Sequence, residues 1–163
     1  MLIGVVSDTH NNIKNIDRII SLFNDKEVDL VIHTGDITNP NSLKRFTKLN
    51  CKFAGVLGNN DRSEPGLIEA AKENSLRLEA PPLELSEFKR NITIFHEPDS
   101  IANYLEENKD TDIVLHGHTH RYRNETLNGI LFFNPGESAG IFPGKNAIGI
   151  IDLEDLSIER IFF

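Results

Sequence analysis

Five short polar segments each follow directly after an apolar run, and this recurrence limits the possible folds more than any other feature of the sequence. In an open α/β sheet, ligands bind beyond the carboxyl ends of the strands. Side chains that follow several strands at that end are therefore predicted to converge on one rim of the sheet. The segments are Asp8-Thr9-His10, Gly35-Asp36, Gly58-Asn59-Asn60-Asp61, His96, and His116-Gly117-His118-Thr119-His120.

The first two thirds of the chain alternate between short β-branched runs and helical patterns. This alternation is typical of α/β units around a largely parallel sheet. Asn11 or Asn12 is placed to cap the first helix, and Leu83 and Leu85 predict a short edge strand. Strands are expected at 2–7, 28–33, 53–57, 92–95 and 113–115, and helices within 13–23, 43–49, 67–71 and 101–105.

The last third changes character. Asn128-Gly129 is a strong hairpin turn between two strand patterns, and a second hairpin is predicted around Glu154-Asp155. We expect these antiparallel strands to form a second sheet that packs on the first, with helices outside. No linker or repeat divides the chain, so residues 1–163 are predicted to form one α/β domain.

Composition sets bounds on function. The 163 residues are 39% hydrophobic and 26% charged, as in a soluble globular protein. The net charge of −8 argues against nucleic acid as a partner, so a phosphate substrate would need a local cation such as a bound metal. The first apolar stretch is too short for a signal peptide or a membrane span, so no membrane partner is expected. The single cysteine, Cys51, fits a reducing cytoplasm.

The residue types in the five segments agree with a metal site. Carboxylate oxygen, imidazole nitrogen and amide oxygen suit Mn, Fe, Ni, Co or Zn, and thiolate is absent. Seven such ligands are too many for one tetrahedral ion, but they suit two ions, roughly 3.5–4 Å apart, that share a carboxylate. Gly35, Gly58 and Gly117 are interpreted as sharp exits from strands.

In order and spacing, these segments resemble the motifs of the calcineurin-like metallophosphoesterase superfamily, which read D-x-H, G-D, G-N-x-D/E, a lone His and G-H-x-H. Asn134-Pro135-Gly136 is similar to a turn in the small prokaryotic phosphodiesterase branch of that superfamily. The resemblance implies a four-layer α/β/β/α sandwich of two mixed sheets with helices on the outer faces. It also implies a dinuclear metal-dependent phosphoesterase, a hydrolase of small phosphodiesters.

The resemblance further implies a role for each residue. A hydroxide bridging two divalent cations, most simply Mn²⁺ or Ni²⁺, would attack phosphorus in line, while Asp36 bridges the ions and Asp61 supports its neighbours. The first ion would be held by Asp8, His10, Asp36 and His120, and the second by Asp36, Asn59, His96 and His118.

The sequence departs from the family pattern at three places. Asn60 stands where much of the superfamily has a histidine that can protonate the leaving group, so we expect a bias towards aryl diesters with acidic leaving groups. Glu97 follows His96 where glycine is usual, and Glu137 follows the Asn-Pro-Gly turn where serine is frequent. Arg62 and Lys145 are candidates for steering the phosphate.

Three alternatives are weighed. His33 and His116, taken alone, are interpreted as structural histidines on strands. A eukaryotic retromer subunit resembles this branch yet acts as a protein-interaction scaffold with a degraded site, whereas none of the seven ligand positions is lost here. A nuclease would need more length and positive charge. The natural substrate, the native metal and the presence of a homo-oligomer are left open.

Overall fold

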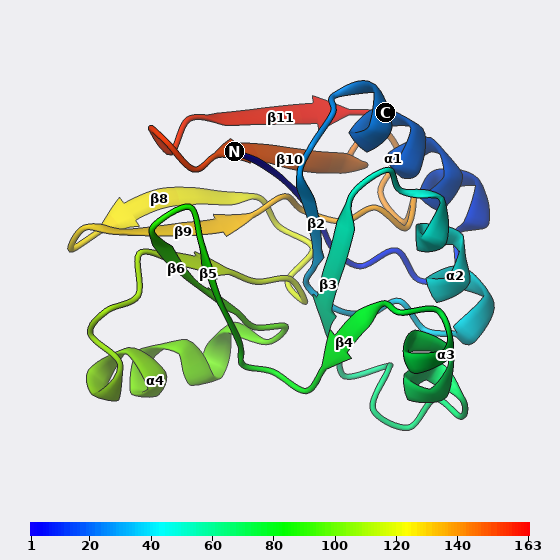
Figure 1. Ribbon diagram of the computed structural model, residues 1–163, viewed down its shortest axis with the longest axis horizontal. Coiled ribbons are helices and arrows are strands. Elements are labelled where there is room, and N and C mark those ends of the chain that lie inside the picture. Colours follow the sequence, from blue (N-terminus) through cyan, green and yellow to red (C-terminus); the bar gives the residue numbers. More distant parts are fainter.

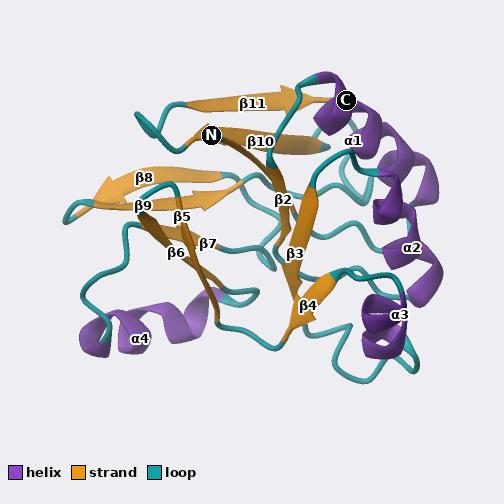
Figure 2. Ribbon diagram, viewed as in Figure 1, coloured by secondary structure: helices purple, strands orange, loops and turns teal.

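The computed structural model describes residues 1–163 and contains two β-sheets packed face to face (Figures 1 and 2). The six-stranded sheet has the order β11-β10-β1-β2-β3-β4, and the five-stranded sheet has the order β5-β6-β7-β9-β8. The strands of the first sheet are β1 (Leu2–Val6), β2 (Leu30–His33), β3 (Lys52–Val56), β4 (Arg77–Glu79), β10 (Ala147–Asp152) and β11 (Ile158–Phe162). Those of the second are β5 (Leu83–Glu87), β6 (Arg90–Ile94), β7 (Ile113–Leu115), β8 (Arg123–Leu127) and β9 (Ile130–Asn134).

Helices cover the two outer faces of this pair of sheets (Figure 1). They are α1 (Ile13–Asp25), α2 (Pro40–Arg45), α3 (Leu67–Glu73) and α4 (Ile101–Glu107), with 3₁₀ turns at Phe46–Lys48 and Pro98–Ser100. The first three pack with β1, β2, β3 and β10 in one apolar cluster, and α4 packs on the outer face of the second sheet. A third cluster fills the space between the sheets. The α/β/β/α sandwich is therefore confirmed.

The division of strands between the sheets differs from the prediction. The C-terminal hairpin β10–β11 was expected in the second sheet, but β10 pairs antiparallel with β1 in the first, where Gly4 lies opposite Ile150. β6 and β7 were expected in the first sheet but lie in the second, which contains parallel as well as antiparallel pairs. Periodicity shows that β10 is buried on both faces, but it cannot show which interior position a strand takes.

Short polar contacts fix the ends of the elements near the carboxyl edge. Asn12, rather than Asn11, caps α1, since its side chain accepts a hydrogen bond from the backbone NH of Asn15 at 3.1 Å. The amide groups of Asn12 and Asn15 also donate to the carbonyls of Ala139 and Ser138 at 2.7 and 2.8 Å. The start of α1 therefore holds the segment that leads from β9 to β10.

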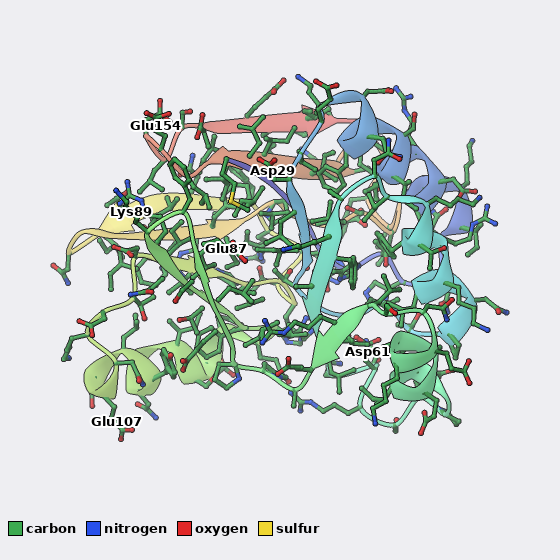
Figure 3. The ribbon with its side chains drawn as sticks, viewed as in Figure 1. Asp29, Asp61, Glu87, Lys89, Glu107 and Glu154 are labelled. Atoms are coloured by element: carbon green, nitrogen blue, oxygen red, sulfur yellow. The ribbon has the colours of Figure 1, made fainter.

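Two acidic pairs, Glu106-Glu107 on α4 and Glu154-Asp155 in the β10–β11 turn, lie on the surface. Figure 3 shows Glu107 and Glu154 projecting from the rim of the molecule, and both are exposed. None of the helices combines the length and the apolar run that crossing a bilayer requires.

Candidate metal centre

All five polar segments meet in one place, although they come from two sheets rather than from one rim. The first three follow β1, β2 and β3 of the six-stranded sheet, and the last two follow β6 and β7 of the five-stranded sheet. Because the two sheets pack face to face with these strand ends on the same side, their loops close over a common point. Three of the seven candidate ligands, Asp8, Asp36 and His96, are buried.

The carboxylate of Asp36 lies between two groups of side chains. Its Oδ2 atom is 3.5 Å from His10 Nε2, and its Oδ1 atom is 3.5 Å from His96 Nε2. On the first side, His120 Nε2 lies 3.4 Å from Asp8 Oδ1. On the second side, Asn59 Oδ1 lies 3.0 Å from both His96 Nε2 and His118 Nδ1. The seven predicted ligands therefore lie close together around Asp36, although Asp8, predicted for the first ion, also lies near His96, predicted for the second.

The donor atoms are arranged as if around cations. Asp8, His10 and His120 form one set of ligand atoms that all lie within 4.8 Å of one another, and Asp8, Asp36 and His96 form another. Neighbouring ligands on an ion with bonds of about 2.1 Å are separated by about 3.0–3.5 Å. The separations given above match this range, while His10 Nε2 and Asp8 Oδ1 are 3.9 Å apart. Asp8 Oδ1 and His10 Nε2 are buried polar atoms with no hydrogen-bond partner. A shared cation would satisfy both.

The hydrogen bonds of His96 also suit a metal ligand. Its Nδ1 lies 2.8 Å from the carbonyl of Thr34, so Nδ1 carries a proton and donates it. Its Nε2 then faces Asn59 Oδ1, and two acceptor atoms do not attract each other. A proton or a cation between them resolves this contact, and a carbonyl behind the imidazole is a common support for a metal-ligating histidine. The residues present therefore fit a site for two divalent ions.

The electrostatics keep the carboxylates charged. Burial acts to raise the pKa of Asp36, but the hydrogen bond and charge of His96 and the bonds from Asn60 outweigh it, so the pKa lies below its usual range. At Asp8, burial also acts to raise the pKa, but the hydrogen bonds from His120 and Ser7 outweigh it, so the pKa of Asp8 is lowered. The bond to Asp8 raises the pKa of His120 against the effect of burial. The centre thus offers negative oxygen atoms to a cation.

The backbone is strained where these side chains project. Asp8, His10, Asp36, His118 and His120 all have positive φ, between 39° and 65°, a region that costs a non-glycine residue about 1–3 kcal/mol. Two of them are held by neighbouring loops, because Asp8 N donates to Gly35 O and His10 N to Asp36 O, both at 3.1 Å. Five of the seven candidate ligands therefore sit on backbone that non-glycine residues rarely adopt, as do several turn residues elsewhere in the chain.

Asp61 holds two of the loops together. It is buried, and its carboxylate accepts hydrogen bonds from the backbone NH groups of Asp36 and Gly58 at 2.8 Å and of Thr38 at 2.7 Å. It therefore supports the loop that carries Asp36, as the sequence analysis expected, and its side chain is not directed at the ligand groups.

The glycines serve the centre in two different ways. Gly35 has a φ of 106°, which confirms a turn that favours glycine, and a Cβ atom there would lie 2.5 Å from His96 Nδ1. Gly58 and Gly117 also lie where the chain turns away from a strand, since Asp61 N donates to Gly58 O at 3.1 Å and Thr119 N to Gly117 O at 2.7 Å, but neither glycine has left-handed backbone. A Cβ atom at Gly58 would overlap Asp36 Oδ1, and one at Gly117 would overlap Ser7 Oγ. These two positions need space rather than conformational freedom.

Asn60, Arg62 and Glu97 lie at the outer side of the centre. The Asn60 amide donates from Nδ2 to Asp36 Oδ2 at 2.8 Å, and its backbone NH donates to Asp36 Oδ1 at 3.0 Å. Arg62 forms an ion pair with Glu97, so the charge of Glu97 is balanced, and this carboxylate belongs to neither group of metal-binding side chains. As expected before Pro98, Glu97 is extended, with φ −84° and ψ 134°.

The two other histidines have structural contacts. His33 is fully buried on β2, accepts from Gly35 N at 3.1 Å and contacts Thr9 Oγ1 at 3.1 Å. Burial lowers the pKa of His33 to about 4, and burial also lowers the pKa of His116, so both are neutral. His116 was expected on a strand but follows β7, where it contacts the carbonyl of Gly117 at 3.3 Å.

The sequence analysis missed three residues that support the ligands. Ser7 Oγ donates to Asp8 Oδ2, the carbonyl of Thr34 receives His96, and Asn134 Nδ2 donates to Gly117 O at 3.1 Å. Ser7 and Thr34 each lie directly beside a recognised motif. Their position, polar residues at the end of an apolar strand, could have indicated that they support the neighbouring ligands. Asn134 had been noted only as part of a turn.

Comparison with known proteins agrees with this geometry. The model of the calcineurin-like phosphoesterase superfamily domain matches residues 1–156. A phosphodiesterase of Methanocaldococcus jannaschii is 36% identical over 157 residues, which cover 94% of each chain. A solved archaeal phosphodiesterase superimposes with a TM-score of 0.91 at 32% identity, covering 100% of both chains.

A more distant structure shares only the fold. Vps29 from Entamoeba histolytica, solved with Zn²⁺, superimposes with a TM-score of 0.71 at 18% identity and covers 99% of both chains. The family match covers every strand except β11 and every one of the five polar segments. The chain therefore belongs to the calcineurin-like phosphoesterase superfamily, a family of metal-dependent hydrolases.

Proposed function

We propose that this chain, acting as a single domain, is a phosphodiesterase with two divalent ions that share Asp36. The first ion is held by Asp8, His10, Asp36 and His120, and the second by Asp36, Asn59, His96 and His118. The observation that carries the proposal is the position of the Asp36 carboxylate, which presents Oδ2 to His10 and Oδ1 to His96, each at 3.5 Å. The phosphodiesterases similar to this chain in sequence and fold support the same reaction class.

When bound, the two ions supply a bridging hydroxide as the nucleophile and neutralise charge on the phosphate oxygens. The protein keeps the donors fixed, since Asp61 anchors the Asp36 loop and Thr34 orients His96. Asn59 and His118 are exposed, whereas Asp8 and Asp36 are buried, so a substrate approaches from the side of Asn59 and His118. Both charged oxygen ligands lie on the far side, away from an incoming anionic diester.

Asn60 shapes the choice of leaving group. Its amide can donate a hydrogen bond but cannot deliver a proton at neutral pH, so it does not act as a general acid. Aryl oxides leave without a proton more readily than alkoxides do. We therefore propose a preference for diesters with acidic leaving groups. Arg62, paired with Glu97, is positioned to meet the phosphate only after that ion pair opens.

Mn²⁺ or Ni²⁺ is the proposed metal, because nitrogen and oxygen donors without thiolate suit these ions, while Fe, Co and Zn share the same preference in part. The scaffold alternative is not favoured. A scaffold has no need to retain seven donors in converging geometry, nor to keep strained backbone at Asp8 and Asp36.

The test uses purified protein, bis-p-nitrophenyl phosphate and either Mn²⁺ or Ni²⁺, with Asp36→Asn as the matched variant. We expect metal-dependent release of p-nitrophenol by the unaltered chain only. Metal at about 100 times its Kd should also stabilise the fold by about 2.7 kcal/mol, which raises Tm by about 5–10 °C for a chain of this size. A scaffold would show no metal-dependent turnover above that of the Asp36→Asn variant, whether or not metal raises its Tm.

A further inference from the structure

A cavity lies directly beside the proposed metal centre. Its volume is about 780 Å³, within the range of small-molecule sites, and His120, a proposed ligand of the first ion, forms part of its wall. The remaining wall comes from the segment after β7, the segment between β9 and β10, and β11. The lining residues are Thr119, His120, Arg121, Tyr122, Ile141, Phe142, Lys145 and Arg160.

The charge of this cavity is opposite to that of the chain. Arg121, Lys145 and Arg160 line it, and no carboxylate does, although the chain has a net charge of −8. None of the three cations forms an ion pair, whereas Arg62 and Arg123 are paired with glutamates. Each of four other cavities includes at least one acidic side chain. The cavity beside His120 is therefore suited to an anion.

The cavity also presents large apolar side chains to solvent. Phe142 is 52% exposed and Tyr122 is 44% exposed. The guanidinium of Arg160 lies 4.1 Å from the centre of the Tyr122 ring and donates from Nε to the carbonyl of Pro135 at 3.1 Å. Arg160 thus packs against the Tyr122 ring within the cavity wall, and flat aromatic groups stack on aromatic and guanidinium surfaces of this kind.

Glu137 holds the segment that carries Phe142. This glutamate is buried and accepts hydrogen bonds from the backbone NH groups of Gly140 and Phe142, both at 2.9 Å. The side chains of Asn12 and Asn15 bind the same segment from the start of α1. Glu137, which departs from the family pattern, therefore has a role in placing the aromatic wall of the cavity.

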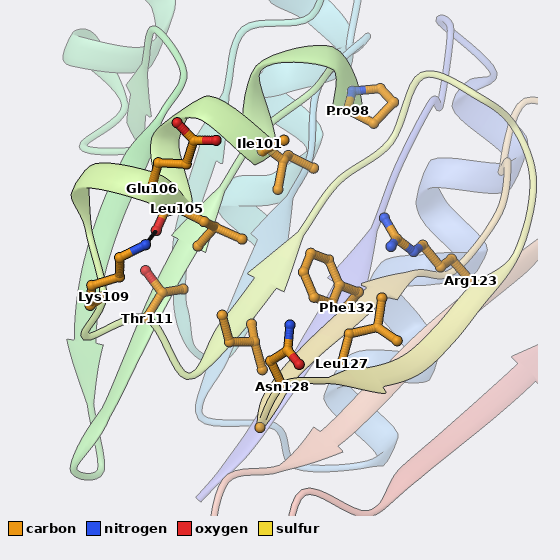
Figure 4. Close-up of a pocket in the computed structure, with 13 residues that line it drawn as sticks. Pro98, Ile101, Leu105, Glu106, Lys109, Thr111, Arg123, Leu127, Asn128 and Phe132 are labelled. Atoms are coloured by element: carbon orange, nitrogen blue, oxygen red, sulfur yellow. Dashed lines mark hydrogen bonds between the residues drawn. The ribbon is translucent and has the colours of Figure 1, made fainter.

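The groove between α4 and the β8–β9 hairpin differs from this cavity in its charge and in its distance from the proposed ligands (Figure 4). It has a volume of about 620 Å³, contains Glu106 beside its cations, and includes none of the proposed metal ligands. Lys109 donates to the carbonyl of Leu105 at 3.0 Å and is thus engaged with its own helix. Nothing about this groove connects it to a phosphate ester.

We propose that the cavity beside His120 is a substrate subsite that binds one organic group of the diester, and that this group is a nucleoside bearing a second phosphate. The inference rests on the proposed function. The base stacks against Phe142 and Tyr122, and the second phosphate is received by Arg121 and Lys145. Hydrolysis adds water across one P–O bond of the diester, and the cavity takes no covalent part. Short phosphorylated dinucleotides fit this description, while long nucleic acids are repelled by the acidic chain.

The charge of the cavity is tested with thymidylyl-(3′,5′)-thymidine, with and without a 5′-phosphate, in the presence of Mn²⁺. A hydrogen bond to a charged group corresponds to about tenfold in binding, so we expect kcat/KM about tenfold higher for the phosphorylated dinucleotide. In the double variant Arg121→Gln and Lys145→Gln this ratio should fall to near one. The control is Lys52→Gln, an exposed lysine at the start of β3 that should keep the tenfold ratio. Equal rates on both substrates, or a ratio that the double variant leaves intact, would overturn the proposal.

The aromatic wall is tested with Phe142→Ala against Phe88→Ala, since both rings are 52% exposed and Phe88 lies in the β5–β6 turn. Stacking of a base corresponds to about fivefold or more, so we expect KM for the dinucleotide to rise by that factor in Phe142→Ala only. Equal effects would contradict the subsite.

Bis-p-nitrophenyl phosphate separates the two proposals, because failure to hydrolyse it refutes the phosphodiesterase itself. If bis-p-nitrophenyl phosphate is hydrolysed but the alkyl leaving group of the dinucleotides makes their turnover too slow to measure, both dinucleotides are compared as competitive inhibitors of that reaction, and equal inhibition constants refute only the subsite.

Discussion

The two sheets contribute different chemistry to the proposed metal centre. The loops after β1, β2 and β3 bring all the oxygen donors, Asp8, Asp36 and Asn59, together with His10. The loops after β6 and β7 bring only imidazoles, those of His96, His118 and His120. One sheet therefore provides negative charge, and the other provides neutral donors that complete each coordination sphere. The centre exists only where the two sheets meet.

The two sides also differ in how firmly they are held. The loop of Asp36 is anchored by short hydrogen bonds from the backbone NH groups of Asp36 and Thr38 to Asp61, and Asp36 itself is buried. His118, in contrast, is exposed, and its imidazole contacts Asn59 Oδ1 at 3.0 Å. The buried carboxylates of the first sheet form a rigid charged floor, and the exposed His118 of the second sheet lies at an adjustable rim, while His96 of the second sheet is as buried as the floor. Four substitutions test this contrast.

The largest effect is expected from Asp36→Asn, which removes the shared charge from the floor. Changing a residue that merely supports a metal ligand costs about 10–100-fold, so loss of the shared ligand should lower kcat/KM by more than a hundredfold. Steady-state rates on bis-p-nitrophenyl phosphate at several Mn²⁺ concentrations measure this. Activity recovered at high metal concentration would show that Asp36 binds an ion without bridging two.

Asp61→Asn tests the anchoring of the floor. In the unaltered protein, backbone NH groups donate to the Asp61 carboxylate. In the variant, the NH₂ group of the amide faces some of these NH groups, and each buried donor left without a partner costs about 1–3 kcal/mol. We expect the free energy of unfolding to fall by about 3 kcal/mol, measured by urea denaturation without metal. Asp25→Asn, at an exposed position on α1, is the control. If both variants unfold at the same urea concentration, Asp61 does not anchor the loops.

His118→Gln probes the adjustable rim. Glutamine offers a weaker oxygen donor at an exposed position, so we expect kcat/KM to fall about tenfold at limiting Mn²⁺. Most of that loss should be regained at saturating metal, because the charged floor is unchanged. A loss that metal cannot restore would place His118 with Asp36 as an essential ligand and weaken the contrast between the sheets.

The smallest effect is expected from Asn60→His, which restores a proton donor. General acid catalysis assists alkyl leaving groups more than aryl ones, so kcat/KM on an alkyl diester should rise severalfold more than on bis-p-nitrophenyl phosphate. The measurement compares the two rates in one preparation. A uniform change on both diesters would mean that Asn60 acts through its bonds to Asp36 rather than through the missing proton.

The sequence was enough to predict the convergence of the ligands but not the sheet that carries each of them. Asp8, Asp36 and Asn59 follow strands in a regular α/β alternation, and their common edge follows from the parallel pairing of β1, β2 and β3. His96 and His118 follow β6 and β7, whose alternation with α4 looks the same in sequence. Their place in the second sheet depends on packing between the sheets, which a local pattern does not encode.

Tertiary contacts also decide what single positions do. Gly58 reads as a turn residue, yet the space it leaves is taken by Asp36. Glu137 reads as a departure from a family pattern, and only the structure joins its carboxylate to the NH groups of Gly140 and Phe142. β4 was missed because Leu78 is its one buried residue, too little for a periodic signal.

The pairing of β1 with β10 has a consequence for how the protein is made. β1 lies between β2 and β10, and Gly4 meets Ile150 across the antiparallel pair. Ribosomes add about 5–20 residues per second and chains fold from the amino end, so β1 waits roughly ten seconds or more for this neighbour. During that interval one edge of a highly apolar strand is open to other nascent chains. Chaperone capture before residue 147 emerges is therefore expected to matter more to the yield of this protein than any step after its release.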